Sequence, residues 1–306
     1  MSKLSEALAR GEFVVTSEVG PPKGTRVDEL MAKAALLARW THAVNVTEQQ
    51  HSCMKLSSLA ACALLCQRGV EPIVHAVCRD RNRVALQSDL LAAWALGIRN
   101  VLVLTGDHPR MGDHPEALPV FDLDSVQLLL AVQRLNQGFD LAENPLEGAT
   151  DFFAGAVVNP TSDALELQLI KMKKKVEAGA RFFQTQAIFA PERLEAFMER
   201  AAPLRVPVLA GLVLPKSHTL ARFMKEKVPG MYVPDELIAE LSTVPKAERR
   251  QKAVEVAARI IRRIRPVCQG VHIMALGWEE LLPDILAQAG LREKPWEDPD
   301  NPHIPE

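Results

Sequence analysis

Residues 72–109 read PIVHAVCRDRNRVALQSDLLAAWALGIRNVLVLTGDHP, and this segment already indicates how the chain folds. It opens with an apolar run, Pro72–Val77, and closes on a second one, Asn100–Thr105, which leads into Gly-Asp-His-Pro. Between the two, Arg83–Leu96 carries apolar side chains at helical spacing, and Gly97 stands where such a helix should end. Strands that are apolar throughout are typical of a parallel sheet with helices on its faces.

The same unit recurs along the rest of the chain. The other predicted strands are Phe13–Val19, Ala43–Thr47, Phe152–Val158, Arg181–Gln186, Val206–Leu212 and Val271–Ala275. The other predicted helices are Val27–Arg39, Leu56–Arg68, Ser125–Leu135, Asp163–Ala178, Pro191–Ala202 and Lys246–Ile264. This alternation predicts an α/β fold, a (β/α)8 barrel in which residues 1–292 form a single catalytic domain. An open α/β sheet with a small helical domain is the alternative, although the chain has neither a Rossmann nor a P-loop glycine motif.

Composition excludes several classes of protein. The 306 residues include 36 Lys and Arg against 38 Asp and Glu, a net charge of -2, so we expect no nucleic acid and no anionic membrane as partner. No apolar run approaches the roughly 18 residues of a membrane-spanning helix, and the N-terminus lacks the apolar region of an export signal. Five cysteines without disulfide-scaffold spacing suit a reducing compartment, which predicts a cytoplasmic protein. Residues 293–306 are acidic and rich in proline, and we expect them to form a loose tail.

Polar residues stand at the ends of most predicted strands. In a (β/α)8 barrel these ends meet at one mouth, where catalytic side chains gather. Glu18 ends the first strand, Asp107 follows the fourth, and Gln186 ends the sixth. Each alone has an ordinary explanation: a surface carboxylate for Glu18, a turn for Asp107, a backbone hydrogen bond for Gln186. Their common placement favours a functional site.

A metal site is not expected. Cys62 and Cys66 are four residues apart on a predicted helix, but zinc takes four ligands, and two cysteines in an apolar helix are typical core residues. The repeated Gly-Asp-His-Pro at 106–109 and 112–115 has metal-binding residue types, yet it lies in one long predicted loop. A nucleophile motif of the G-x-S-x-G kind is also absent from the sequence.

The strand-end residues resemble those of the flavin-dependent methylenetetrahydrofolate reductases, (β/α)8 enzymes that reduce a methylene-folate to a methyl-folate. The likeness covers residues 10–290, and the order and spacing of its motifs make it fairly specific. The motifs are Ser17-Glu18 with Pro21-Pro22, Val44-Asn45-Val46-Thr47, His75-Ala76-Val77-Cys78, Gly97-Ile98-Arg99-Asn100, Leu104-Thr105-Gly106-Asp107-His108-Pro109, residues 173–180, Thr185-Gln186, and Gly211 to Pro215.

The resemblance implies a role for three of these residues. Glu18 occupies the position of the family's general acid, which delivers a proton to N10 as the methylene bridge opens, and burial that raises its pKa towards neutral would suit this task. Asp107 matches the aspartate beside flavin and pterin, whose negative charge stabilises the iminium cation. Gln186 matches the residue that hydrogen-bonds the pterin.

The resemblance also implies a flavin site, with some differences. The family's flavin-contact positions fall on Thr47, His75, Gly106, Asp107 and Lys175. Three further flavin positions carry other residue types: Thr105 where arginine is common, Asn159 where a His-Pro-Glu run begins, and Gln168 in place of an acidic residue. No aromatic residue is evident after the seventh strand, where His218-Thr219 stand. Because several lost contacts belong to the phosphate and adenosine side of FAD, we expect FAD or, if binding is altered, FMN.

The resemblance therefore implies an oxidoreductase of folate one-carbon metabolism and methionine biosynthesis that reduces 5,10-methylenetetrahydrofolate to 5-methyltetrahydrofolate. NAD(P)H or an electron-donating partner subunit would supply the electrons, and a homo-oligomer is left open. A flavin-free folate-binding methyltransferase barrel is one alternative. A non-catalytic subunit of a reductase complex is the other.

Overall fold

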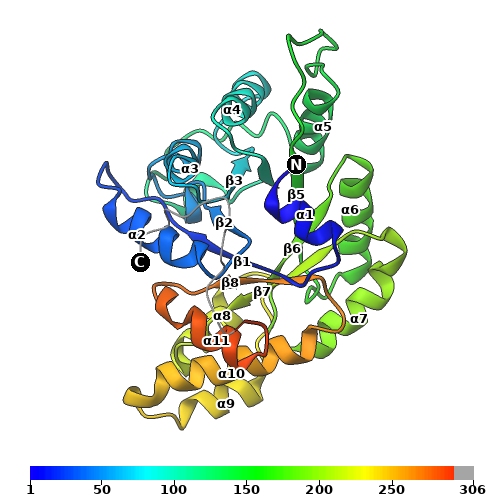
Figure 1. Cartoon of the computed structure of the whole chain (residues 1–306). Helices are drawn as coiled ribbons and strands as arrows, with labels where there is room; N and C mark the ends of the chain where they lie inside the picture. Colours follow the sequence, from blue (N-terminus) through cyan, green and yellow to red (C-terminus); the bar gives the residue numbers. More distant parts are fainter. Residues whose placement is uncertain (293–306) are drawn as a thin grey trace.

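The computed structural model describes residues 1–292, and its centre is a closed barrel of parallel strands (Figure 1). The strands are β1 (Val14–Val19), β2 (Ala43–Val46), β3 (Pro72–Val77), β4 (Asn100–Leu104), β5 (Phe153–Val158), β6 (Phe182–Ala187), β7 (Val208–Val213) and β8 (Gly270–Met274). Each strand pairs with the next along the chain, and β8 pairs with β1. The predicted (β/α)8 barrel is confirmed, and the open sheet is wrong. The predicted tail, residues 293–306, lies outside the described residues.

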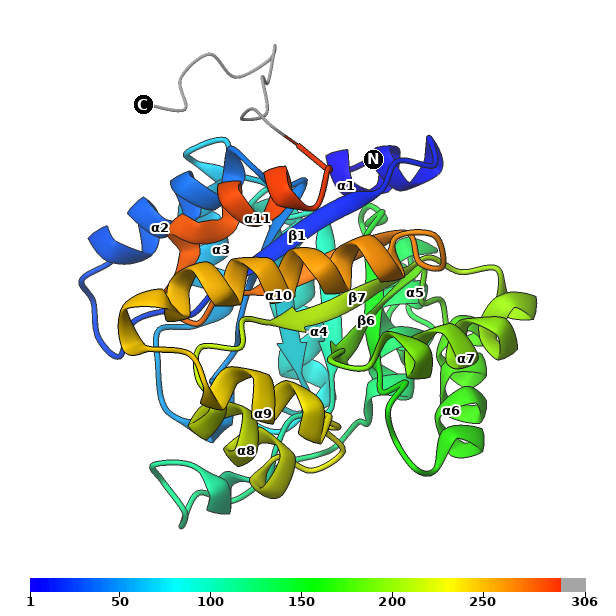
Figure 2. The same cartoon turned by 90° about the horizontal axis from the view of Figure 1, so that it is seen from below.

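Helices surround the barrel (Figures 1 and 2). They are α1 (Lys3–Ala9), α2 (Asp28–Ala38), α3 (Ser58–Cys66), α4 (Arg83–Ala95), α5 (Ser125–Asn136), α6 (Leu165–Glu177), α7 (Pro191–Ala201), α8 (His218–Lys227), α9 (Asp235–Ser242), α10 (Arg249–Ile264) and α11 (Leu282–Gln288). The sequence missed α1, α8, α9 and α11. It also began the third helix too early, because the Ser57 hydroxyl caps α3 by accepting a hydrogen bond from Ala60 N–H. Gly69, Gly97 and Gly179 end three helices with positive φ, as expected.

An apolar layer and α1 close the N-terminal end of the barrel. The layer comprises Val14, Ala43, Ile73, Leu102, Phe153, Phe182 and Leu209, and Leu4 and Ala7 of α1 pack against it. The Glu71 carboxylate holds α1 in place, since its oxygens accept hydrogen bonds from the backbone N–H groups of Lys3 (2.8 Å) and Leu4 (2.9 Å). Ligands can therefore enter the barrel interior only from the other end.

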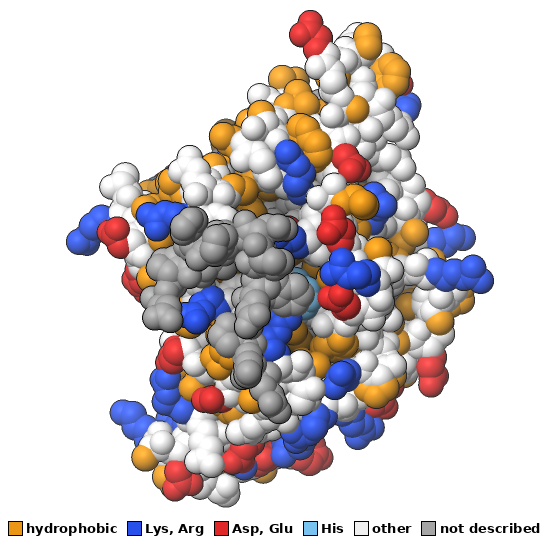
Figure 3. Space-filling model, viewed as in Figure 1, with side chains coloured by type: hydrophobic (Ala, Val, Ile, Leu, Met, Phe, Trp, Pro, Cys, Tyr) orange, Lys and Arg blue, Asp and Glu red, His pale blue; other side chains and the backbone are white. Residues whose placement is uncertain are grey.

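The surface carries no charge of one dominant sign on the face that Figure 3 shows, where basic and acidic side chains are interspersed. This distribution agrees with the overall charge of -2. Among the described residues, no helix is both long enough and apolar enough to cross a membrane.

Gly155 of β5 is the point of closest packing inside the barrel. A Cβ atom on Gly155 would overlap the ring of Phe182, its neighbour on β6. That ring is fully buried and stacks on Phe153, with ring centroids 5.1 Å apart, so it has no room to move. The absence of a side chain at Gly155 is thus a packing requirement.

We expect Gly155→Ala to lower the free energy of unfolding by roughly 1–3 kcal/mol, because it overpacks a rigid interior. Urea unfolding measures the loss. In the double variant Gly155→Ala/Phe182→Leu, the smaller side chain makes room for the methyl group, so the two losses should not add. Additive losses would contradict this packing argument.

Candidate active site

The mouth of the barrel collects the residues that the sequence singled out. All strands of the barrel run in the same direction, so their C-terminal ends share one side. Glu18 lies near the end of β1, and Gln186 near the end of β6. Thr47 directly follows β2, and Asp107 follows β4 by three residues. The structure therefore brings all four to one end of the molecule, opposite α1.

A buried layer of polar side chains crosses the barrel beneath this mouth. It consists of the buried side chains of Thr16, Asn45, Gln184 and His272 and the half-buried side chain of His75. Asn45 Nδ2 donates to Gln184 Oε1 (2.9 Å), and Gln184 Nε2 donates back to Asn45 Oδ1 (3.1 Å). Asn45 Nδ2 also donates to His75 Nε2 (3.0 Å), which places the proton of the neutral imidazole on Nδ1. Paired in this way, polar groups are stable inside a barrel.

Glu18 stands on this layer, two residues after Thr16 on the same strand face. His272 links the two, since its Nδ1 lies 3.0 Å from Thr16 Oγ1 and its Nε2 lies 3.5 Å from Glu18 Oε2. Burial works to raise the pKa of the Glu18 carboxyl, but His272, followed by His75 and His51, outweighs it and lowers that pKa below its ordinary value. The raised pKa that would suit a general acid is therefore not found in the free chain, because imidazoles surround the carboxyl, which the sequence did not show.

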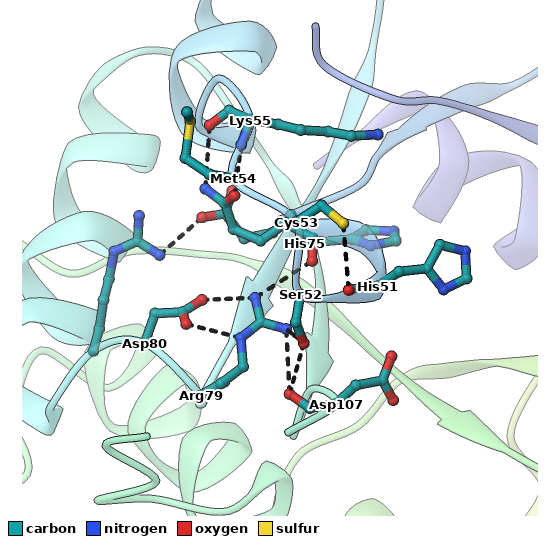
Figure 4. A network of polar contacts seen from close by, with 12 residues as sticks. His51, Ser52, Cys53, Met54, Lys55, His75, Arg79, Asp80 and Asp107 are labelled. Atoms are coloured by element: carbon teal, nitrogen blue, oxygen red, sulfur yellow. Dashed lines mark hydrogen bonds and ion pairs between the residues drawn. The ribbon is translucent and has the colours of Figure 1, made fainter. Parts of the chain in front are cut away.

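Asp107 is held by its backbone and leaves its carboxylate available. Its carbonyl oxygen accepts hydrogen bonds from Ser52 Oγ (3.1 Å) and Arg79 Nη1 (3.4 Å). Within residues 1–292 its carboxylate has no hydrogen bond and no ion pair with a protein group, and it points away from Ser52 and Arg79 (Figure 4). The side chain of His51 extends on the same side of the network. An unpaired, exposed carboxylate thus follows the C-terminal end of β4.

Gln186 and Thr47 each keep unused hydrogen-bonding capacity. Gln186 lies where the register between β6 and β7 shifts, and its Oε1 accepts a hydrogen bond from Ala187 N–H (3.2 Å). The described residues offer no partner to its Nε2. The Thr47 hydroxyl is buried and likewise has no hydrogen-bond partner in the described part of the chain. A buried unpaired hydroxyl is costly, and it indicates a place where a ligand atom belongs.

Comparison with known proteins identifies this architecture. The family model described as methylenetetrahydrofolate reductase matches residues 3–290, almost the whole barrel. The chain belongs to the methylenetetrahydrofolate reductase family. The resemblance that the strand-end motifs indicated is therefore confirmed.

Individual relatives of this family are distant. The 5,10-methylenetetrahydrofolate reductase of Pectobacterium carotovorum is 28% identical over 70% of this chain and 69% of its own length. Methylenetetrahydrofolate reductase 2 of Schizosaccharomyces pombe is 24% identical over 73% of this chain, which spans only 36% of that protein. A solved structure from Clostridium thermocellum, described as binding two copies of 5-methyl-5,6,7,8-tetrahydrofolic acid, has a TM-score of 0.65 at 15% identity and covers 94% of this chain and 98% of its own. At that identity it shows the shared fold alone.

Two of the residues that differ from the reductase family are engaged within the fold. The carboxamide of Asn159 donates through Nδ2 to Gly230 O (2.7 Å) and accepts through Oδ1 from the Thr161 hydroxyl (2.9 Å). The Asn159 N–H donates in turn to Gln168 Oε1 (3.3 Å). These contacts tie the end of β5 to the segment before α9. A flavin contact by Asn159 or Gln168 stays a prediction.

Lys175 and Gly106 lie at two other positions that the family uses for flavin. The Lys175 ammonium donates to Val157 O (2.8 Å) from α6, and burial lowers its pKa to about 8. Gly106 has a φ of +92°, and a Cβ there would lie 2.5 Å from Val77 Cγ1, so only glycine fits. Thr105 beside it is exposed. In the region after β7 where the resemblance implies an aromatic residue, His218 is half-buried and Thr219 is exposed.

Sequence analysis missed three residues that shape this site: Thr16, Gln184 and Arg79. The first two had a readable signal, because each lies two positions before a predicted site residue and therefore on the same strand face. Arg79 had none, since its partners lie on two other loops. Within the described residues, no group of His, Cys, Asp and Glu side chains is placed to hold a metal ion, and Cys62 and Cys66 are free thiols of α3.

The neutral state of His75 predicts a dependence of stability on pH. Burial lowers the pKa of His75 to about 4, against 6.5 for an ordinary histidine. Between these two pH values the unfolded chain binds more protons than the folded chain. The contribution of neutral His75 to the free energy of unfolding is therefore complete above pH 6.5 and is lost as the pH falls towards 4. The loss is at most about 3 kcal/mol.

Urea unfolding between about pH 7 and about pH 5 tests this prediction. The free energy of unfolding should fall across that interval, and His75→Gln should make the fall shallower. His42 adds to the wild-type slope, because burial lowers its pKa to about 4 as well. If the free energy of unfolding changes with pH equally in wild type and His75→Gln, His75 is protonated in the folded chain.

Proposed function

We propose that the chain is a flavin-dependent reductase that converts 5,10-methylenetetrahydrofolate to 5-methyltetrahydrofolate. The observation that carries this proposal is the arrangement at the C-terminal ends of the strands, where Glu18 stands beside His272 and the Asp107 carboxylate follows β4 without a protein partner among the described residues. Membership of the reductase family supports it. So does the folate named for the Clostridium thermocellum structure, whose fold this chain shares. We also place the activity in the cytoplasm, since the five cysteines are free thiols.

The residues at the mouth fit a flavin. Thr47 offers an unpaired buried hydroxyl, and Gly106 allows the segment after β4 to pack closely against Val77 and Arg79 beside the mouth. Lys175 adds a buried donor near the end of β5, and burial lowers the pKa of its ammonium group to about 8. A bound flavin would supply the reducing equivalents for the methylene carbon. The protein contributes binding, orientation and electrostatics.

Glu18 is the group that moves a proton. Opening the methylene bridge needs a proton on N10 of the folate, and a carboxyl at the mouth can deliver it. In the free chain the histidines hold the pKa of Glu18 low. A pterin that covers the mouth excludes the remaining water, which strengthens the effect of burial and raises that pKa. Substrate binding itself therefore prepares Glu18 as an acid.

Asp107 and Gln186 act on the substrate in other ways. The Asp107 carboxylate, without a cationic partner in the described residues, stabilises the positive charge that develops when the bridge opens. The free Nε2 of Gln186 donates to an acceptor on the pterin ring. Asp107 and Gln186 lie at the same mouth as Glu18, and together the three groups set the orientation of the pterin ring.

The identity of the flavin and of the electron donor forms a finer part of the proposal. Asn159 donates through its side chain to Gly230 O and through its backbone N–H to Gln168 Oε1, so these groups offer little to the phosphate or adenosine of FAD. This favours FMN, and electrons delivered by a partner protein. Mass spectrometry of the released cofactor, with NADH oxidation by the purified chain, tests both points. Stoichiometric FAD together with rapid NADH oxidation would contradict them.

The absorbance spectrum of the purified chain separates the proposal from its alternatives. A flavin-free methyltransferase barrel would bind methyl-folate without a flavin spectrum. A non-catalytic subunit would show neither folate reduction nor reduction of a bound flavin.

Glu18→Gln should lower the rate of folate reduction by about 100-fold or more, because it removes the proton donor but keeps the shape. Reduction of the flavin by its electron donor should stay within about twofold of wild type. Stopped-flow measurement of the two half-reactions checks both expectations. Glu12→Gln is the matched control, since Glu12 pairs with Arg10 (2.6 Å) at the opposite end of β1. Loss of both half-reactions in Glu18→Gln would assign Glu18 a structural role.

Thr47→Val tests the flavin site without an activity assay. Removing a buried, unpaired hydroxyl should raise the free energy of unfolding of the flavin-free chain by about 1 kcal/mol. The same change should weaken flavin binding by about threefold to tenfold, since the ligand loses a hydrogen bond. Thr185→Val is the control: its hydroxyl donates to Gln186 O (2.7 Å) and accepts from Gly211 N–H (2.9 Å), so its loss should only destabilise. Unchanged flavin affinity in Thr47→Val would place the flavin elsewhere.

A further inference from the structure

Arg79, which follows β3, is a buried arginine whose donors all serve the two loops beside the mouth and its own neighbour (Figure 4). Its Nε and Nη2 donate to the two carboxylate oxygens of Asp80 (2.8 and 2.7 Å). Its Nη1 donates to Ser52 Oγ (3.0 Å) and to Asp107 O (3.4 Å), and its Nη2 also reaches Gln49 O (3.4 Å). The charge is neutralised by Asp80, and the remaining donors join the segment after β2 to the segment after β4.

The segment after β2 needs such support, because its backbone is strained. Gln49, His51 and Ser52 have φ values of 44°, 56° and 56°, in the left-handed region that residues other than glycine avoid. Arg79 contacts the segment at Gln49 O and at Ser52 Oγ. The Gln49 side chain fixes its far end, since Oε1 accepts from Lys55 N–H (2.8 Å) and Nε2 donates to Lys55 O (3.2 Å). The conformation persists because these contacts hold it from two sides.

Ser52 connects Arg79 to the segment that carries Asp107. Its hydroxyl, which accepts from Arg79, lies within donating distance of Asp107 O (3.1 Å) and His108 O (3.3 Å). The two segments also pack directly, since a Cβ on Gly112 would overlap the backbone of Ser52. Arg79 O in turn accepts from Val120 N–H (2.8 Å), near the end of the same loop. One residue thus holds both ends of the loop between β4 and α5.

We propose that Arg79 is a positioning residue for Asp107: it fixes the backbone of both mouth segments so that the Asp107 carboxylate points to the substrate. This inference rests on the proposed function for the task of Asp107. Asp80 neutralises the charge of Arg79. Arg79 therefore acts on Asp107 through geometry, by its contacts with Asp107 O and Ser52.

Arg79→Lys and Arg79→Ala separate position from charge. Lysine keeps the charge beside Asp80 but cannot reach Ser52, Asp107 and Gln49 together, so both variants should lower the rate of folate reduction by at least about tenfold. Flavin reduction should stay within about twofold of wild type. Millimolar guanidinium, far below denaturing concentrations, should restore part of the activity of Arg79→Ala, since it fits the space that the side chain leaves.

Arg81→Met is the matched control. Arg81 lies in the same loop and pairs with buried Glu48 (2.9 Å) and with Asp89 (2.9 Å), without a contact to Asp107. Arg81→Met should lose as much stability as the Arg79 variants. It should lower the rates of folate reduction and of flavin reduction equally, or change neither. Ser52→Ala provides a milder test, because it breaks the link to Asp107 O without uncovering a buried charge. It should reduce folate reduction in the same direction as the Arg79 variants.

Hydrogen exchange of the full-length chain gives a readout independent of activity. Backbone amides of residues 105–112 should exchange faster in Arg79→Lys and Ser52→Ala than in Arg81→Met. If Arg79→Lys behaves as wild type in rate and exchange, or if Arg81→Met loses folate reduction to the same extent, the positioning role is wrong. If wild-type chain reduces no folate, the proposed function fails, and the exchange data alone decide whether Arg79 fixes this segment.

Discussion

The reciprocal hydrogen bonds between the Asn45 and Gln184 carboxamides hold the centre of the barrel together. They join β2 to β6 across the interior, at 2.9 and 3.1 Å, and both side chains are almost completely buried. Two amides in an apolar interior would be very costly if either lost its partner, so the pair admits one arrangement of the surrounding strands. Below it the barrel is filled by apolar side chains and closed by α1. Above it lies the other end of the barrel, where Glu18 and Gln186 stand near the ends of β1 and β6.

The electrostatics of Glu18 follow from this layer. Thr16 and His75, which bond to the amide pair, and His272, which bonds to Thr16, set the surroundings of the carboxyl from below. Burial and the imidazoles act on its pKa in opposite directions, and in the free chain the imidazoles prevail. A group balanced in this way responds strongly when a ligand changes its solvation. The polar layer thus makes the protonation of Glu18 depend on what occupies the mouth.

Much of the fold could be predicted from the sequence, because a strand of a closed parallel barrel is apolar on both faces and the glycines at 69, 97 and 179 end helices where strands follow. Glu18 and Asp107 could be placed at the mouth because polar residues recur at the ends of the predicted strands, and their roles stay predictions. The polar layer beneath the mouth could not be predicted, since its partners Asn45 and Gln184 are 139 residues apart in the sequence. The irregularity of β6, which separates Gln184 in the layer from Gln186 at the mouth, has no local signature either. Helices α8 and α9 were missed because no strand separates them from α10, so the alternation of strand and helix gave no signal for them.

The distribution of unused hydrogen-bonding capacity supports our proposal that the site lies at the mouth. Beneath the mouth, polar groups satisfy one another: the amide pair in the barrel, and the Arg79 guanidinium with Asp80, Ser52 and Asp107 O beside it. At the mouth the Thr47 hydroxyl, the Gln186 amide nitrogen and the Asp107 carboxylate remain without protein partners among residues 1–292. An unpaired buried atom such as Asn100 Oδ1 also occurs elsewhere in the described chain, so it is the gathering of three unpaired groups at one opening that indicates a ligand. Their presence is accounted for by a ligand with matching polar atoms, as a planar ring with several donors and acceptors has.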